Sequence, residues 1–361
     1  MSPLAQIIAS EIHAGGPLPF RRFMELALYH PDWGYYERTA EQIGQVGDFF
    51  TSVSVGSLFG ELLGFQFAQW QCDSAGAIFQ LIEAGAHDGR LACDILNYFR
   101  AWQPALYDRL EYWIVEPSLR RQSRQAKQLG DNGGRVRFVR SLDALPANGI
   151  NGIIFANELL DAFPVTRLGW DAHLRSWFEW GVAHTDDRFV WERMPARTCD
   201  GKALPSLPKE LLAVLPDGFT TEICPAVIDW WKQASARLKR GHLLTFDYGF
   251  CAEQLFAPER AAGTLRGYRR HRVVDDVLAD PGEQDITAHI NFAALRDTGE
   301  AAGLKNTAFV PQSKFLTEIA NQTWQLRAPF PDWTAARIRQ FQSLTHPDHL
   351  GRAFQVLAQT K

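Results

Sequence analysis

The segment from residue 77 to residue 99, AIFQLIEAGAHDGRLACDILNYF, constrains the fold of this chain most strongly. It opens with a short run that is apolar on both faces, which is typical of a buried strand in a parallel sheet. The run ends at Glu83, and a turn of small residues containing Gly85 and Gly89 follows. Apolar residues then recur with the spacing of one helical face, at Leu91, Ile95 and Phe99. This order predicts the first half of a nucleotide-binding βαβ unit.

The turn favours one class of nucleotide ligand. A dinucleotide fingerprint needs a third glycine at a fixed spacing, and this turn has only Gly85 and Gly89. A carboxylate at Glu83 would repel a phosphate but not a cationic ligand with an amino acid tail and a ribose. The pattern therefore predicts S-adenosylmethionine, bound at Glu83, Gly85, Ala86 and Gly89. A tight turn without a ligand remains the alternative, because such short patterns recur by chance.

The composition excludes several classes of protein. Of the 361 residues, 46% are hydrophobic and 22% are charged, as in an ordinary soluble globular protein. The formal net charge is −4 without a basic block, so we expect no nucleic-acid partner. We also expect no membrane insertion and no secretory signal, since the apolar runs are short. Five scattered cysteines without a CxxC pair predict a cytoplasmic protein that has neither disulfides nor a metal site.

The N-terminal region reads as helical. Two helices are expected between residues 3 and 30, and another is expected to begin at Leu58. Just before it, a glycine-rich segment carries Gly47, Asp48 and Thr51. This segment is interpreted either as a helix cap or as a loop over a ligand. Residues 1–75 are thus predicted to form a helical segment that packs on the core.

Acidic residues follow the next two predicted strands. The strand at 110–115 ends at Glu116, whose carboxylate can accept two hydrogen bonds from a ribose diol. The strand at 136–139 is followed by Asp143, which we assign to the adenine amino group. Both positions are predicted to bind the cofactor.

A fourth strand, at 152–156, runs directly into Asn157, Glu158 and Asp161. Ligands of open α/β sheets bind at the carboxyl ends of the strands, so these polar groups are candidates for the site. If a helix begins here, Glu158 and Asp161 share one of its faces.

The strand–helix alternation is then interrupted. Residues 165–222 contain alternating, aromatic-rich runs separated by turns, which predict a small antiparallel insertion. A helix at 226–238 and a strand at 242–246 return to the parallel sheet. The predicted fold class is α/β, a Rossmann-like sheet with a helical N-terminal segment and this insertion. Its core is expected to comprise residues 76–164 and 223–325.

The C-terminal third is less regular. Long irregular segments are usually functional or disordered, so Asp285 and His289 in the 250–290 segment are further candidates. A helix at 292–302 and a strand at 307–310 follow. Residues 326–361 are predicted to be helical, with helices near 332–344 and 350–358. His346 and His349 lack companion ligands, so a loop is favoured there over a metal site.

Several long motifs resemble the MidA family over nearly the whole chain. They are LYHPDWGYY, VGDFFTS, SLFGE, EAGAHDGRLACDIL, ANELLDAFPV, DYG, GTLRGY, GEQDITAHINF and HLGRAFQVL. The family includes mitochondrial methyltransferases that assist assembly of respiratory complex I. The resemblance implies a class I methyltransferase fold, with S-adenosylmethionine as cofactor and S-adenosylhomocysteine as product. It also implies methylation of a protein arginine, in a substrate such as a complex I subunit.

The resemblance also implies roles for individual residues. Glu83, Gly85 and Gly89 fall on the cofactor loop of the family, and Glu116 on its ribose position. The N-terminal loop of the family corresponds to Gly47, Asp48 and Thr51, which favours ligand contact over capping there. Its NE-x-x-DA-x-P motif corresponds to Asn157, Glu158 and Asp161. One departure is His87, which stands where the pattern usually has a small residue and which could crowd the cofactor or bind it.

The mechanism expected for a guanidinium acceptor requires carboxylates that orient it against the methyl group. Glu158 and Asp161 are predicted to do this beside Asn157, with Asp285 or His289 closing the site. Two other classes stay open at this point. A non-catalytic assembly factor could bind the cofactor without turnover, and the incomplete glycine pattern argues against a nicotinamide-dependent oxidoreductase.

Overall fold

The computed structural model describes residues 1–38, 51–71, 78–195, 207–269, 272–326, 329–347, 350–351 and 354–361. The chain divides into two compact units. The first comprises Met1–Phe49, Asp161–Ile228 and Phe250–Ala293, and the second comprises Phe50–Leu160, Asp229–Gly249 and Ala294–Lys361. Each unit therefore gathers segments that are far apart in the sequence.

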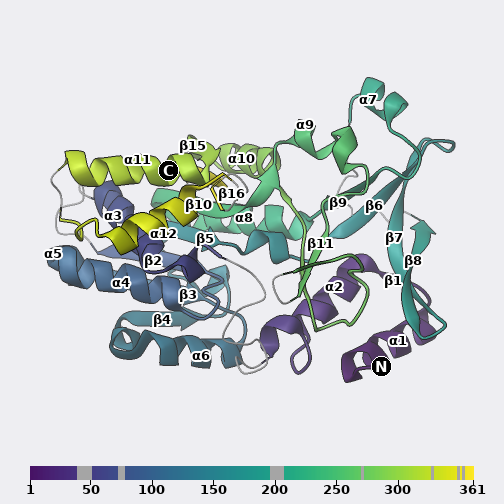
Figure 1. Ribbon diagram of the computed structural model, residues 1–361, viewed down its shortest axis with the longest axis horizontal. Helices are drawn as coiled ribbons and strands as arrows, with labels where there is room; N and C mark the ends of the chain where they lie inside the picture. The colour runs from purple at the N-terminus through teal and green to yellow at the C-terminus, as the bar shows by residue number, and fades with distance from the viewer. Residues whose placement is uncertain are drawn as a thin grey trace. The chain divides into compact units, whose positions relative to one another are not determined.

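The second unit is built on a largely parallel sheet with the strand order β15-β16-β10-β5-β2-β3-β4 (Figure 1). The strands from β10 to β4 are parallel to one another, whereas β16 is antiparallel to both β10 and β15. The bounds are β2 (Phe79–Ala84), β3 (Leu110–Val115), β4 (Val136–Val139), β5 (Ile150–Asn157), β10 (Leu238–Phe250), β15 (Lys305–Pro311) and β16 (Phe354–Thr360). The predicted α/β class and Rossmann-like sheet are confirmed.

Both faces of this sheet are covered, which is why its central strands are apolar on both sides. One face packs on helices, through residues such as Leu81 and Ile153, in a core shared with α3, α4, α11 and α12. The opposite face packs on α8. The side chain of Gln359 on β16 points away from the face that holds Ala358, and it accepts a hydrogen bond from Trp231 of α8 at 2.9 Å. The helices are α3 (Leu58–Gln71), α4 (Arg90–Trp102), α5 (Pro104–Tyr107), α6 (Leu119–Leu129), α8 (Pro225–Arg237), α10 (Phe292–Ala301), α11 (Gln312–Gln325) and α12 (Ala335–Thr345).

The C-terminal end of the chain corrects one prediction. The helix expected near residues 350–358 is instead the strand β16, which pairs between β10 and β15. Apolar residues at 350, 354 and 357 have helical spacing, but Val356 and Ala358 are buried as well. A strand covered on both faces buries every residue, so the helical spacing was coincidental. The helix α11 was not predicted.

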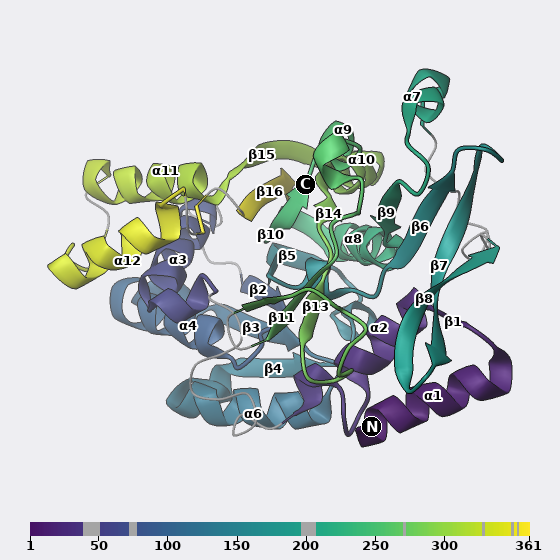
Figure 2. The same cartoon turned by 45° about the vertical axis from the view of Figure 1, so that its right-hand side comes forward.

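The first unit contains an antiparallel sheet of β1, β6, β7, β8 and β9, as predicted for the insertion (Figure 2). Its register pairs Leu18 of β1 with Val182 of β7, so the N-terminal segment also contributes a short strand. A second small sheet has the order β12-β11-β13. The bounds are α1 (Pro3–Gly15), β1 (Leu18–Pro19), α2 (Phe20–Tyr29), β6 (Thr166–Asp171), β7 (Ser176–Thr185), β8 (Arg188–Pro195), α7 (Lys209–Val214), β9 (Thr220–Ile223), α9 (Ala252–Leu255), β11 (Arg266–Arg269), β12 (Arg272–Val274), β13 (Asp285–Thr287) and β14 (Ile290–Asn291).

Candidate functional site

The turn after β2 has a backbone that requires glycine. Gly85 has φ +72°, and a Cβ atom there would lie 2.6 Å from Cδ1 of Leu159. Gly89 has φ +88° and is the N-cap of α4. Between them, His87 also adopts a positive φ of 48°. Its side chain is 74% exposed and lies 3.9 Å from the Asp88 carboxylate, so the imidazole is directed to solvent in this turn.

Glu83, at the carboxyl end of β2, is buried. Its carboxylate accepts a hydrogen bond of 2.7 Å from the hydroxyl of Tyr112 on β3. Burial nevertheless raises the pKa of Glu83 to about 8. The side chain is therefore mostly protonated at neutral pH, and the repulsion of a phosphate by a charged Glu83, which the sequence argument assumed, is weak.

Glu116, one residue beyond β3, is held by four donors. Its Oε1 accepts hydrogen bonds of 2.9 Å from both the Ser118 amide and Nε of Arg121, and Nη2 of Arg121 lies 2.7 Å away. Gln125 on α6 donates to its Oε2 at 3.2 Å, and the same amide group donates to the main-chain carbonyl of His87 at 3.0 Å. The structure therefore brings the predicted ribose acid next to the glycine turn.

The end of β5 carries the motif residues Asn157 and Glu158. One Glu158 oxygen accepts hydrogen bonds from the Ser52 amide at 3.1 Å and from Nδ2 of Asn157 at 3.2 Å. Burial raises the pKa of Glu158 to about 7, and Asp247 acts in the same direction. Glu158 thus changes its charge near neutral pH.

The helix considered as a possibility after β5 does not form. Glu158 has φ +52°, and Leu160–Ala162 form a single 3-10 turn. The chain leaves β5 in a left-handed conformation because the Glu158 amide donates to the Phe246 carbonyl of β10 at 2.9 Å. Glu158 and Asp161 therefore do not share a helical face.

Two other predicted cofactor residues have local partners. Asp143 is 72% exposed and pairs with Arg237 of α8 at 2.9 Å. Thr51 accepts a hydrogen bond from the Ser54 amide at 3.1 Å, in a local turn that precedes α3 and does not cap it. Gly47 and Asp48 lie outside the described residues. The cofactor roles of all four stay predictions.

Three candidate residues belong to the first unit: Asp161, Asp285 and His289. Asp285 accepts a 2.7 Å hydrogen bond from the Tyr36 hydroxyl, and the Asp161 carbonyl accepts one of 2.9 Å from the Ala288 amide. The second bond joins the 3-10 turn to the segment that follows β13. Burial, with two nearby arginines, lowers the pKa of His289 to about 4, so its ring is neutral at neutral pH.

Sequence reasoning missed the residues that hold the candidates in place. Gln125 links Glu116 to the glycine turn, Ser52 binds Glu158 through its amide, and Tyr36 binds Asp285. Asp247, which follows the apolar part of β10, accepts hydrogen bonds from the Leu160 and Tyr248 amides, both of 2.8 Å. Asp247 had a signal in the sequence, as an acid at the end of a predicted strand, and Tyr36 and Ser52 lie in the motifs LYHPDWGYY and VGDFFTS.

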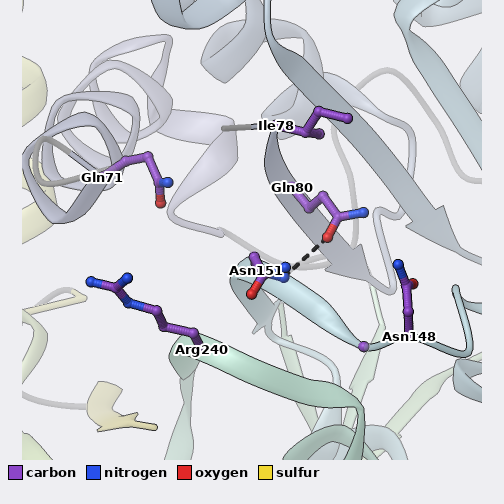
Figure 3. A pocket seen from close by; sticks show the side chains of 7 residues that line it. Gln71, Ile78, Gln80, Asn148, Asn151 and Arg240 are labelled. Carbon is purple, nitrogen blue, oxygen red and sulfur yellow. Dashed lines mark hydrogen bonds between the residues drawn. The ribbon is translucent and has the colours of Figure 1, made fainter. Parts of the chain in front are cut away.

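A cavity of about 370 Å³ lies at the opposite ends of the parallel strands from these residues. Figure 3 shows Gln80 near the start of β2 and Asn151 at β5, where the Asn151 amide donates to Gln80 at 3.0 Å. We do not include this cavity in the candidate site, because open α/β sheets bind ligands at the carboxyl ends of their strands.

The described residues show neither a metal-binding cluster nor a membrane-spanning helix. Within them, three or more His, Cys, Asp or Glu side chains nowhere gather in a way that could hold a metal ion. The helices in the same residues are too short or too polar to cross a membrane.

Comparison with known proteins agrees with this architecture. A crystal structure of a Burkholderia thailandensis protein bound to S-adenosylhomocysteine is 31% identical in sequence, with a TM-score of 0.82, covering 99% of this chain and 92% of that one. The Drosophila melanogaster protein named protein arginine methyltransferase NDUFAF7 homolog is 27% identical, covering 98% of this chain and 84% of its own length. Human protein arginine methyltransferase NDUFAF7 is 26% identical, covering 99% and 83%.

These relatives correct the predicted location. Both the fly and the human protein are named as mitochondrial, which contradicts the cytoplasmic prediction. Scattered cysteines without a CxxC pair argue only against an oxidising compartment and do not distinguish the cytosol from other reducing compartments.

A family described as "Putative S-adenosyl-L-methionine-dependent methyltransferase" matches residues 62–310, which is more than half of the chain. The match covers β2, the glycine turn and the Asn157–Glu158 motif. The chain therefore belongs to this family of S-adenosylmethionine-dependent methyltransferases and is an enzyme that uses S-adenosylmethionine as its cofactor.

Proposed function

We propose that this enzyme methylates a guanidinium nitrogen of an arginine in a protein, and that the protein is a subunit of respiratory complex I. The observation that carries the proposal is the partly buried carboxylate of Glu158 at the end of β5, which accepts hydrogen bonds from Ser52 and Asn157. Relatives named protein arginine methyltransferase align with 96% to 99% of the chain in seven of eight cases, which supports the same acceptor. The resemblance to the MidA family supports the complex I substrate.

The residues around the glycine turn fit S-adenosylmethionine. Gly85 and Gly89 adopt the left-handed backbone that a tight turn between β2 and α4 needs, and this turn places backbone N–H groups near the N-terminus of α4. Among the described residues, the buried Oδ1 of Asn157 has no hydrogen-bond partner and could accept one from the cofactor. We assign Glu83, Gly85, Ala86 and Gly89 to the cofactor together with Asn157, and Glu116 to its ribose. Thr51, Gly47, Asp48 and Asp143 remain further candidates.

When bound, the cofactor supplies an electrophilic methyl group on a sulfonium. A guanidinium nitrogen forms the new N–C bond while the C–S bond breaks, and the electron pair of that bond stays on sulfur. Glu158 orients the guanidinium by charge-assisted hydrogen bonds, which the acceptor keeps as its nitrogen attacks. Asp161 remains a further candidate for this role. The product then releases a proton to water or to Glu158, whose pKa of about 7 allows it to accept one.

The test uses the purified protein, S-adenosylmethionine with a labelled methyl group, and complex I subunits supplied one at a time. Acid hydrolysis of the labelled subunit, followed by amino acid analysis, should yield N-methylarginine. Glu158→Gln should reduce the rate at least 100-fold while the affinity for S-adenosylhomocysteine changes less than about threefold. Label recovered only on another amino acid would contradict arginine as the acceptor. Equal loss of cofactor binding would contradict the role of Glu158.

A further inference from the structure

A buried glutamine at the start of α11 is connected to Glu158 through one intermediate residue. Gln312 is fully buried, and its Oε1 accepts a hydrogen bond of 3.1 Å from the Ser52 hydroxyl. The main-chain amide of Ser52 donates to Oε1 of Glu158 at 3.1 Å. Gln312 and Ser52 are 260 positions apart in the sequence, and all three residues belong to the second unit. The fold of this unit alone therefore brings these contacts together.

The other end of the Gln312 amide group fixes its orientation. Its Nε2 donates to the main-chain carbonyl of Leu344 at 3.1 Å. Leu344 lies in the last turn of α12, where the carbonyls have no donor within the helix. A carbonyl can only accept, so the nitrogen of the Gln312 side chain faces Leu344 and its oxygen faces Ser52. The Ser52 hydroxyl must therefore donate, and its direction is fixed as well.

The Ser52 amide reaches Glu158 from a short turn. Ser52 is fully buried and directly precedes the 3-10 turn Val53–Val55, which contains no buried residue. Ser54 is exposed and bonds back to Thr51 within the same turn. The hydroxyl bond to Gln312 thus anchors this turn to α11 and holds the Ser52 amide at the Glu158 carboxylate.

Both of these donors to Glu158 bind the same oxygen. The Ser52 amide and Nδ2 of Asn157 each donate to Oε1, at 3.1 and 3.2 Å. The backbone of Glu158 is fixed separately, because its amide donates to the Phe246 carbonyl. With the backbone and Oε1 held, Oε2 is the oxygen that these donors leave for a cation such as a guanidinium. A shift of about 1 Å in such a group can reduce a rate about 100-fold.

We propose that Gln312 is a positioning residue for methyl transfer. It holds the Ser52 turn, and the Ser52 amide in turn holds the Glu158 carboxylate in the orientation that receives the acceptor. The inference rests on the proposed function, because it needs Glu158 to orient the acceptor guanidinium. It predicts that Gln312 acts on the rate through Glu158 and leaves the cofactor residues Glu83 and Glu116 undisturbed.

The test is Gln312→Met, which keeps the size of the side chain and removes both hydrogen bonds. With the complex I subunit that the wild-type enzyme methylates, kcat should fall about tenfold, while the affinity for S-adenosylhomocysteine stays within about twofold. Burial raises the pKa of Glu158 and the Ser52 amide bond lowers it, so the midpoint of the pH–rate profile should also move to higher pH. Asp247 and His87 also act on this pKa, but they are the same in both proteins.

A second variant removes the same contact from its other end. Ser52→Ala keeps the bond between Gln312 and Leu344, so the test does not depend on the folding of Gln312→Met. It should reproduce the loss in kcat and the shift of the midpoint, and combining the two substitutions should change kcat less than about twofold further. In the Glu158→Gln background, Gln312→Met should likewise have less than about a twofold effect, because the group through which Gln312 acts is gone.

The matched control is Gln359→Met on β16. Gln359 is another fully buried glutamine of the second unit, and it bonds Trp231 and the Arg296 carbonyl. Its replacement should lower the melting temperature as Gln312→Met does, but leave kcat within about twofold of wild type and the midpoint unmoved.

Two results would overturn the inference while leaving arginine methylation intact. One is an equal kinetic effect at the two glutamines, and the other is a loss of stability in Gln312→Met and Ser52→Ala without a shift of the midpoint. Methylation of some other side chain by the wild-type enzyme would overturn the proposed function, and the inference with it.

Discussion

The buried acid at the end of β2 makes the stability of the enzyme depend on pH in a way that one substitution should abolish. Burial raises the pKa of Glu83 from 4.5 to about 8. Between these two values the folded protein binds a proton that the unfolded chain releases. Stability therefore falls as the pH rises through this window, and the loss ends above pH 8, where Glu83 ionises in the folded state as well.

The size of the effect follows from the width of the window. A difference of one bound proton costs about 1.4 kcal/mol for each pH unit. From pH 5 to pH 8 the difference is close to one proton at first and shrinks to about half at pH 8, so the loss is about 3 kcal/mol. Glu83→Gln removes the titrating group but keeps an oxygen that can accept the Tyr112 hydrogen bond.

The assay is urea unfolding of both proteins without cofactor, at pH 5, 6, 7 and 8. Other titrating groups contribute equally to the two proteins, so they cancel in the difference between them. Glu83→Gln should match the wild type to within about 1 kcal/mol at pH 5 and exceed it by about 3 kcal/mol at pH 8. Tyr112→Phe is a control that should act in the opposite direction. The Tyr112 hydrogen bond lowers the pKa of Glu83, so its removal should raise that pKa and make stability fall more steeply with pH than in the wild type. Parallel pH curves for wild type and Glu83→Gln would refute the reasoning.

Three further substitutions test the candidate site. The wild-type rate should rise about tenfold from pH 6 to pH 8 as Glu158, with its pKa of about 7, ionises, and the residual rate of Glu158→Gln should be flat. Gly85→Ala should cost more unfolding free energy than Gly130→Ala, about 2 against about 1 kcal/mol, because only the Gly85 Cβ would meet Leu159. A smaller loss at Gly85 would argue against steric crowding in the turn. Glu116→Gln should weaken S-adenosylhomocysteine binding about tenfold by calorimetry, and unchanged affinity would remove Glu116 from the ribose.

Local patterns predicted much of the sheet because burial on both faces leaves a clear signal. The strands at 110–115 and 136–139 match β3 and β4 residue for residue. Burial on both faces also led to the wrong prediction for β16, because apolar residues on both faces of a strand can include a set with helical spacing. Pairing with β10 and β15 decided the outcome there, and that pairing involves residues more than 40 positions away.

The candidate site was predictable as a set of strand ends but not as a set of contacts. An acid after a strand can be recognised in the sequence, as Glu83 and Glu116 were. The partners of those acids cannot, because they come from other strands and helices. The left-handed backbone of Glu158 likewise accompanies a hydrogen bond to Phe246, 88 residues away, so local sequence could not decide whether a helix begins there.

The two strand-end acids show why position alone does not determine chemistry. Glu83 faces one neutral hydroxyl in a buried site, and at neutral pH it holds a proton. Glu116 is buried to a similar degree, yet its Oε1 lies 2.7 Å from Nη2 of Arg121 and it forms an ion pair. A neutral acid can donate one hydrogen bond to a ligand, whereas a paired carboxylate can only accept them. Glu83→Gln should therefore preserve S-adenosylhomocysteine binding better than Glu116→Gln, because only the first substitution replaces a group that is already uncharged.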